Sequence, residues 1–231
     1  MLNAKNIPTS GNGGGDRPDP LESGTYPARL VQVILLGTQA QRPYKGQDKP
    51  PALELYLTYE FLDEFMKDEE GNDIEDKPRW LSERVPFYNL EIERAKSTKR
   101  YYALDPTGKY DGDWSKLLGA PVMVTVITAE GKGKNTGKVF NNIASTSAMR
   151  EREAAKAPDL INPPKVFDFY EPDMEVFNSL PDWLKEVIKE AVDFGGSALE
   201  IAIQDGDEIP LDKPKGKTPK KEVIDDDEVE W

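Results

Sequence analysis

Residues 52–61 alternate apolar and more polar side chains without a break, and this period of two constrains the fold more than any other feature of the chain. Successive side chains of an extended strand point to opposite faces, so the pattern sorts the segment into two sets. One face carries Leu53, Leu55, Leu57, Tyr59 and Phe61, and the other carries Glu54, Tyr56, Thr58 and Glu60. The sequence therefore predicts a half-buried strand of an antiparallel sheet.

Strand and helix patterns surround this segment. β-Branched and apolar residues predict four more strands, at 25–36, 79–87, 120–128 and 137–144, and residues 91–104 and 114–118 have helical composition. The predicted order is three strands, a helical connection and a two-stranded hairpin. This is the order of an OB-fold, a five-stranded barrel in which strands 2–3 and loops 1–2 and 4–5 bind oligonucleotides. Several small β-barrels share this order, so the fold class is mainly β with helical additions, with the OB-fold preferred.

We divide the chain into four parts. Residues 1–23 are rich in Gly and Pro and predict a flexible arm, and residues 24–147 form the barrel. Residues 148–203 predict a helical extension packed on the barrel, whose main helix is capped by Ser179, is amphipathic and ends at Gly195. A partner surface is the alternative role for this helix. Residues 204–231 predict a disordered tail.

The tail divides into a basic stalk and an acidic tip. Residues 213–221 are rich in Lys, Pro and Gly, whereas six of the last ten residues are acidic and none is basic. Such a tip can occupy a basic groove on its own protein or dock into a basic pocket of a partner, and a solubilising terminus is the alternative. The candidate partner contacts are Asp225, Asp226, Asp227, Glu228, Glu230 and the apolar anchor Trp231.

The composition excludes several kinds of chemistry. The chain has no Cys and no His, which removes disulfides, thiolate nucleophiles, Ser-His-Asp catalysis and ordinary zinc sites. We therefore expect no enzyme activity, metal or cofactor, although carboxylate-only magnesium chemistry remains open. The acidic loop at 68–76 lacks the spacing of an EF-hand and predicts a solvated turn. No apolar run reaches the ~18 residues of a membrane span, so we expect a cytoplasmic location.

Cations beside aromatic residues occur on three predicted elements. Single-stranded nucleic acid is held by bases stacked on aromatics and by cations on its backbone. The candidates are Arg42, Tyr44 and Lys45 in the first loop, Arg94, Lys99, Arg100 and Tyr101 in the helix, and Lys132, Lys134 and Lys138 in the last hairpin. Tyr56 and Trp80 are candidate stacking platforms. The alternatives are a solvated hairpin turn, a helix whose tyrosines face inward, and a core position for Trp80.

Together, the OB-like strand order, the basic loops and the acidic tail with its terminal aromatic resemble single-stranded DNA-binding proteins of tailed bacteriophages. The resemblance covers residues 24–147 and the tail. It implies sequence-independent coating and protection of single-stranded DNA in replication and recombination, in the host cytoplasm. It further implies a tail that competes with DNA and recruits replication proteins, and we expect a monomer or weak oligomer.

Two other functions fit the sequence. Because the formal net charge is −13, the chain can be an acidic interaction factor or DNA mimic that binds a basic host protein. A carboxylate-metal nuclease is the third hypothesis.

Overall fold

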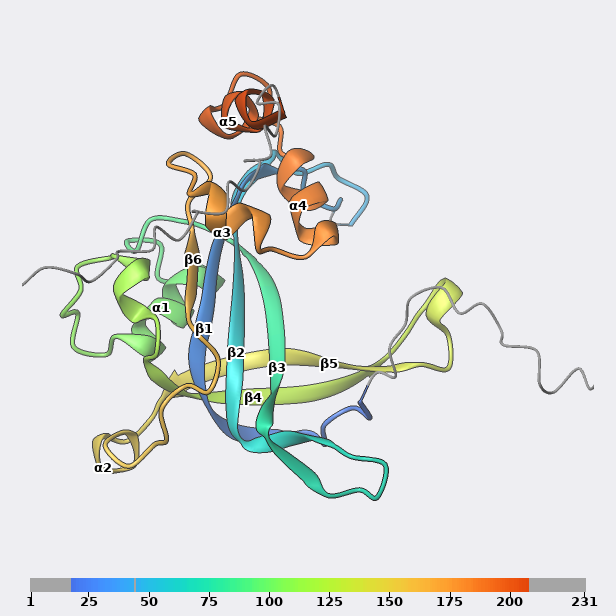
Figure 1. The fold of residues 1–231 in the computed structure, drawn as a ribbon, viewed down its shortest axis with the longest axis vertical. Helices are drawn as coiled ribbons and strands as arrows, with labels where there is room; N and C mark the ends of the chain where they lie inside the picture. The colour runs from blue at the N-terminus through green and yellow to red at the C-terminus, as the bar shows by residue number, and fades with distance from the viewer. Residues whose placement is uncertain (1–17, 44, 208–231) are drawn as a thin grey trace, which may run out of the picture.

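The computed structural model describes residues 18–43 and 45–207, apart from the side chains of Lys134 and Asp207. It is mainly β with short helices, as predicted (Figure 1). The strands are β1 (Gly24–Gln39), β2 (Ala52–Lys67), β3 (Asp73–Pro86), β4 (Pro121–Glu130), β5 (Val139–Ala148) and β6 (Lys165–Phe167). The α-helices are α1 (Lys96–Leu104), α2 (Glu151–Ala154), α3 (Met174–Asn178), α4 (Asp182–Lys189) and α5 (Ala198–Asp207), and 3-10 turns form η2 (Trp114–Leu117) and η3 (Gly133–Asn135).

The sheet is built around β1. Its first part, residues 24–29, pairs with β4, and residues 28–39 pair with β2, so the strand order is β3-β2-β1-β4-β5. Two register shifts, after Leu30 and Leu35, let β1 coil between these partners. β4 and β5 therefore cross behind β1–β3 (Figure 1). β3 and β5 end this path, and within the described residues no ladder joins them, so the sheet is open.

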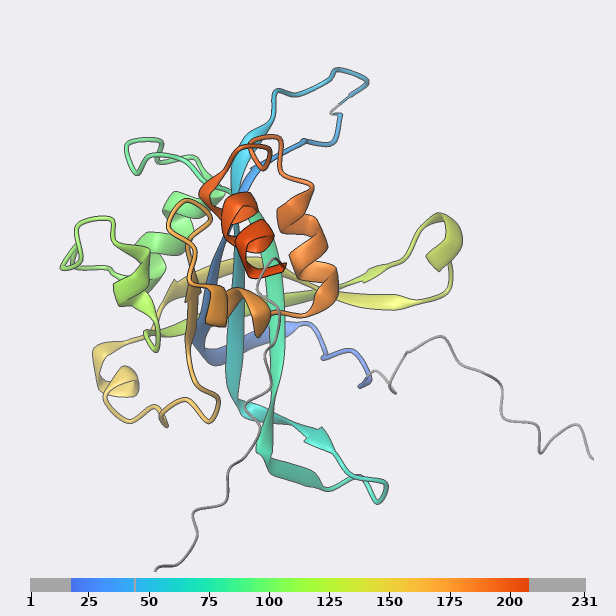
Figure 2. The same cartoon turned by 45° about the horizontal axis from the view of Figure 1, so that its top comes forward.

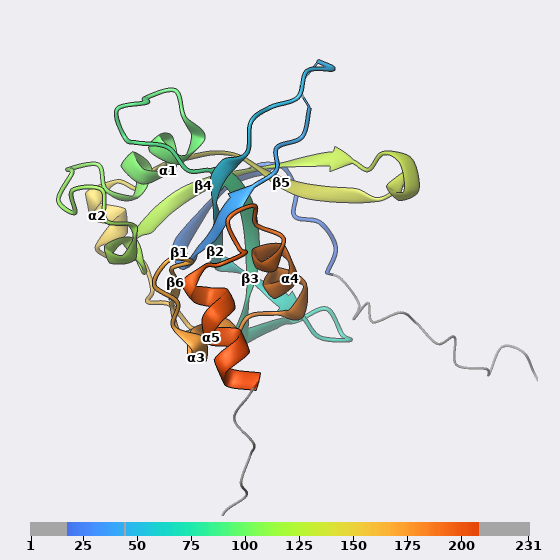
Figure 3. The same ribbon diagram turned by 90° about the horizontal axis from the view of Figure 1, so that it is seen from above.

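β6 adds a further pairing, along the part of the β1 edge that does not pair with β4. β6 pairs there in parallel, with Gln32 opposite Lys165 and Ile34 opposite Phe167. Neither β6 nor α3 was predicted from the sequence, because each is too short to show a period. Viewed from above, β1–β3 form a middle layer between the β4–β5 hairpin and the helices α3–α5 (Figure 3).

The main core fills the space between β1–β3 and β4–β5. The apolar face predicted for residues 52–61 lies there, with Leu55, Leu57, Tyr59 and Phe61 all buried. A fully buried side chain of this size contributes roughly 1.5–3 kcal/mol by leaving water. α1 and η2 pack against the same core through Tyr101, Trp114 and Leu117.

The outer face of β1 and β2 is also largely covered, which corrects the prediction of a half-buried strand. Ile34 and Leu36 of β1 form a second core with Phe167, Phe169, Phe177, Leu184 and Ile188 of the C-terminal segments. In β2, Glu54, Thr58 and Glu60 are buried although they belong to the polar set. The helices α3–α5 lie over the upper end of β1–β3 (Figure 2).

Three predicted boundaries differ from the structure. Ser179 closes α3 instead of capping a long helix, and α4 begins at Asp182 after Pro181. Residues 204–207, predicted as disordered tail, belong to α5. Residues 18–23, assigned to the flexible arm, include the buried Leu21, whose backbone exchanges two hydrogen bonds with the side chain of Asn141.

Candidate nucleic-acid interface

The outer face of β2 and β3 carries a row of paired side chains. The antiparallel register places Trp80 opposite Glu60, Ser82 opposite Thr58 and Arg84 opposite Tyr56. Directly opposite residues project on the same face of a sheet. Positions 80, 82 and 84 therefore line one face of β3, and about 13 Å of strand separates the first from the last.

Trp80 is fixed at one end of this row. Its side chain is 42% exposed, and its indole Nε1 donates a hydrogen bond of 3.1 Å to Glu60 Oε2. Glu60 in turn accepts hydrogen bonds of 2.7 Å from the backbone N–H of Ile161 and from Asn162 Nδ2. The loop before β6 thus anchors the buried carboxylate, and the carboxylate holds an exposed indole.

The middle and far end of the row are also fixed. Thr58 Oγ1 lies 2.9 Å from Ser82 Oγ and 3.1 Å from Gln32 Oε1, which joins three strands through hydroxyl and amide groups. Arg84 forms an ion pair with Glu54, with 2.7 Å between Nη2 and Oε2. Because Glu54 neutralises Arg84, this arginine contributes a fixed planar group and little net charge to the face.

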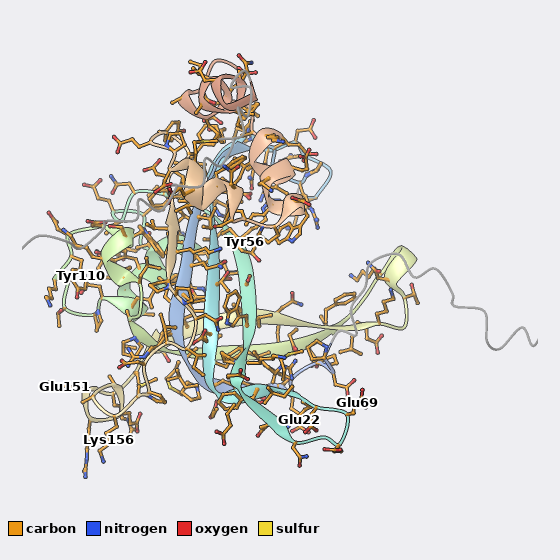
Figure 4. The ribbon with its side chains drawn as sticks, in the orientation of Figure 1. Glu22, Tyr56, Glu69, Tyr110, Glu151 and Lys156 are labelled. Carbon is orange, nitrogen blue, oxygen red and sulfur yellow. The ribbon has the colours of Figure 1, made fainter. Side chains whose placement is uncertain are left out.

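A second exposed indole packs on Tyr56, the residue opposite Arg84. Trp183 of α4 packs edge-on against Tyr56, with ring centroids 5.6 Å apart and an interplanar angle of 71°. Trp183 is 52% exposed, and Tyr56 is partly buried at the end of β2 toward α4 (Figure 4). Tyr56 therefore supports Trp183 and is not itself the outermost platform.

Trp183 is not among the candidate contacts predicted from the sequence. The sequence held one signal. Trp183 and Leu184 are adjacent, and adjacent helical residues point about 100° apart, so both cannot lie at the centre of one buried stripe. Leu184 and Ile188 fill the buried stripe, which leaves Trp183 at its exposed margin.

The predicted cations lie on two sides of the sheet. Arg42 and Lys45 in the β1–β2 loop are exposed, and so are Lys132 and Lys138 in the β4–β5 hairpin. Both segments project on the side away from α1 in all three ribbon views. The exposed Arg94 and Lys99 lie just before and on α1, on the opposite side, so the structure does not gather all the predicted cations into one cleft.

Two predicted DNA contacts are corrected, because both are buried. Arg100 is 3% exposed, and its guanidinium donates to both carboxylate oxygens of Glu83, at 2.6 and 3.2 Å. The ring of Tyr101 lies in the main core, and its hydroxyl donates to Asp105 and accepts from the N–H of Gly112. Burial raises the pKa of Tyr101. The exposed tyrosine of the pair is Tyr102.

Some predicted site residues lie outside the described residues. These are Tyr44, the side chain of Lys134, and the tail positions Asp225, Asp226, Asp227, Glu228, Glu230 and Trp231. The acidic loop is described, and there Asp68 accepts hydrogen bonds from the N–H groups of Glu70 and Asn72, which lower its pKa and close the β2–β3 turn.

Among the described residues, no group of three or more Asp and Glu side chains is arranged to hold a metal ion. Within the same part of the chain, no helix is long and apolar enough to cross a membrane. No family model, curated protein or solved structure matches the chain.

Proposed function

We propose that this protein binds single-stranded DNA without catalysis, along the outer face of β3 and the adjoining surface of α4. The observation that carries the proposal is the pair of exposed, fixed indoles, Trp80 on β3 and Trp183 on α4, the latter packed on Tyr56, which faces Arg84 across the ladder. Each base stacked on an aromatic ring contributes about 1–3 kcal/mol to affinity. Rings that are already held in place lose little side-chain freedom when a base stacks on them.

We also propose that the five strands β1–β5 form the partly open barrel of an OB-fold. The order β3-β2-β1-β4-β5, with β1 shared between two ladders and α1 inserted between β3 and β4, supports this assignment. In such a barrel, the β1–β2 loop and the β4–β5 hairpin flank the binding face. Their exposed cations, Arg42, Lys45, Lys132 and Lys138, are then suited to contact phosphates beside the stacked bases.

The biological role follows from the resemblance described above. In this proposal the protein coats and protects single strands during phage replication and recombination. The acidic tip at 222–231 competes with DNA for the cationic loops and recruits replication proteins. A net charge of −13 is compatible with a polyanionic ligand, because DNA responds to the electrostatic potential of the surface that it contacts and not to the net charge of the chain.

The test is fluorescence anisotropy of a labelled 30-mer oligo-dT at several salt concentrations, with double-stranded DNA and oligo-U of equal length beside it. We expect tight binding to single-stranded DNA that weakens as salt rises, and much weaker binding to the duplex. No binding to oligo-dT at low salt, even after residues 222–231 are removed, would overturn the proposal.

A second function is favoured by a different observation. Val192, Ile201 and Tyr170 of the C-terminal segments are at least half exposed, which suits an acidic protein-interaction factor whose helices contact a partner. Such a protein would fail to bind oligo-dT, and substitution of Val192 and Ile201 by Ser would release the bound partner.

A further inference from the structure

An open hollow of about 950 Å³ lies between α1 and β5, apart from the face that carries the two indoles. Thr98 and Tyr102 of α1 line it on one side, and Thr146 and Ser147 of β5 line it on the other. Its volume is within the range of sites that bind small organic molecules. Neither the resemblance nor the proposed interface assigns a role to it.

Two hydroxyl groups at this hollow have no partner. Thr98 is 1% exposed, and the Oγ1 atoms of Thr98 and Thr146 are buried without a hydrogen bond. A buried hydroxyl without a partner is unfavourable, and a threonine hydroxyl both donates and accepts. Both residues line the same hollow, so rotation of their side chains about χ1 would turn both hydroxyls toward a single ligand with donor and acceptor atoms on one edge.

The charges around the hollow limit what that ligand can be. Three carboxylates, of Glu91, Glu93 and Asp111, line it together with one ammonium group, that of Lys99. An excess of carboxylates disfavours a phosphate inside the hollow and favours N–H donors. Tyr102 is 47% exposed and offers a ring for stacking. These features together fit a planar heterocycle that carries an amino group.

We propose that the hollow binds one nucleobase with an exocyclic amino group, such as cytosine, in preference to thymine. Where the base belongs to a DNA strand, this inference rests on the proposed function. β5 provides the connection, because Lys138 precedes its first residue and Thr146 lies near its last. About 26 Å of strand separates these two positions, so a single strand held at the basic hairpin can follow β5 to the hollow.

The experiment uses the full chain and compares oligo-dC with oligo-dT, both 30-mers, at pH 8. The wild type should bind oligo-dC more tightly, because one added hydrogen bond corresponds to about two- to tenfold in affinity. The double variant Thr98→Val/Thr146→Val should lose this difference while binding oligo-dT as before. The control Thr98→Ser keeps the hydroxyl and should keep the preference. Equal affinities in the wild type would contradict the base site.

The stability of the variants distinguishes misfolding from a specific loss of the base site. Because the two hydroxyls have no partner, replacing them by methyl groups should leave the urea midpoint unchanged or raise it slightly. A variant that is at least as stable but has lost the preference therefore supports a ligand role. A large drop in the urea midpoint would contradict the inference, since it would show that the hydroxyls already stabilise the fold.

A second arm does not depend on DNA binding. Free 2′-deoxycytidine and thymidine, titrated to millimolar concentration, should be compared by the chemical shifts of the backbone amides of residues 98–103. Shifts with deoxycytidine alone would support the base site even if oligo-dT does not bind, in which case only the proposed function would fall. Binding of oligo-dT without any deoxycytidine shift would overturn the base site and leave the proposed function standing.

Discussion

The buried carboxylate of Glu60 and the exposed indole of Trp80 face each other across the β2–β3 ladder and share a hydrogen bond of 3.1 Å. A carboxylate in this position would disfavour a polyanion if it were free. Here its oxygens accept from Ile161, Asn162 and Trp80, so its charge is spread over fixed donors. The acidic residue therefore orients the aromatic one without presenting an open negative charge.

Removing either indole should weaken DNA binding without harming the fold. We expect Trp80→Ala and Trp183→Ala each to lower the affinity for oligo-dT by about 1–3 kcal/mol, the contribution of one stacked base. Tyr88→Ala is the matched control, because Tyr88 is exposed to the same degree as Trp80 but follows β3 outside the row. Anisotropy titrations at fixed salt measure the effect, and equal losses in all three variants would rule out a specific stacking face.

Arg100 should matter for stability and not for contact with DNA. Its guanidinium and the Glu83 carboxylate are both buried and paired at 2.6 Å. Lys96 also pairs with Glu83, at 2.6 Å, and would still compensate its charge, so Arg100→Ala should reduce the free energy of unfolding by about 1–3 kcal/mol through its lost hydrogen bonds. Arg94→Ala, six residues earlier and exposed, should change it by less than about 0.5 kcal/mol. Urea denaturation followed by circular dichroism compares the two variants.

Gly37 and Gly46 form a matched pair for testing how tightly the C-terminal segments pack on β1. Both have φ of +76°, which favours glycine. A Cβ atom on Gly37 would lie 2.9 Å from Cβ of Ala191, whereas one on Gly46 would meet nothing within 4 Å. Gly37→Ala should therefore lower the melting temperature clearly more than Gly46→Ala. The difference between the variants measures the steric clash, since the backbone strain is common to both, and equal shifts would show that β1 and Ala191 are not in close contact.

The residues that a local pattern could predict are those whose environment is set by their own strand. The apolar side of β2 was predicted because alternation alone directs Leu55, Leu57 and Tyr59 to one face. Burial of Glu60 could not be predicted in this way, because its partners Ile161 and Asn162 lie about a hundred residues further along the chain. Pairing over such a distance leaves no periodic trace in either segment.

The helix α1 shows a second limit. Its composition correctly indicated a helix with cations and tyrosines, but composition does not say which side of the helix faces the sheet. Arg100 and Tyr101 point inward, where Glu83 and Asp105 receive them, while Lys99 and Tyr102 point outward. At about 100° per residue these two pairs lie on opposite sides of the helix, so a rotation of about 180° would exchange the buried pair with the exposed one.

Asp193 should make attachment of the C-terminal segments sensitive to acid. It accepts hydrogen bonds from the N–H and hydroxyl of Thr38 and from the hydroxyl of Tyr170, at 2.8–2.9 Å. Burial alone would raise its pKa, but these hydrogen bonds outweigh burial and lower the pKa below its ordinary value. A lowered pKa in the folded state stabilises the fold above about pH 4, and this contribution is lost as the pH falls further.

The measurement is the urea midpoint between pH 7 and pH 3, with Asp193→Asn as the comparison. The wild type should be more stable than the variant at pH 7, and the gap should narrow below about pH 4 as the carboxylate becomes protonated. A gap that stays constant over this range would show that the charge of Asp193 does not contribute to the attachment.

Deleting residues 222–231 should strengthen the binding of DNA, although these residues lie outside the described part of the chain. They carry six acidic side chains and no basic one, so they compete with phosphates for the exposed Lys132 and Lys138 in our proposal. Screening weakens such competition, because the Debye length falls from about 30 Å at 0.01 M salt to about 8 Å at 0.15 M. The gain on deletion should therefore be largest at low salt and shrink as salt rises. A control chain in which the six acids are replaced by Asn and Gln should behave like the deletion, since charge and not length causes the effect. Equal affinity of wild type and deletion at every salt concentration would exclude competition by the tail and leave recruitment of partners as its role.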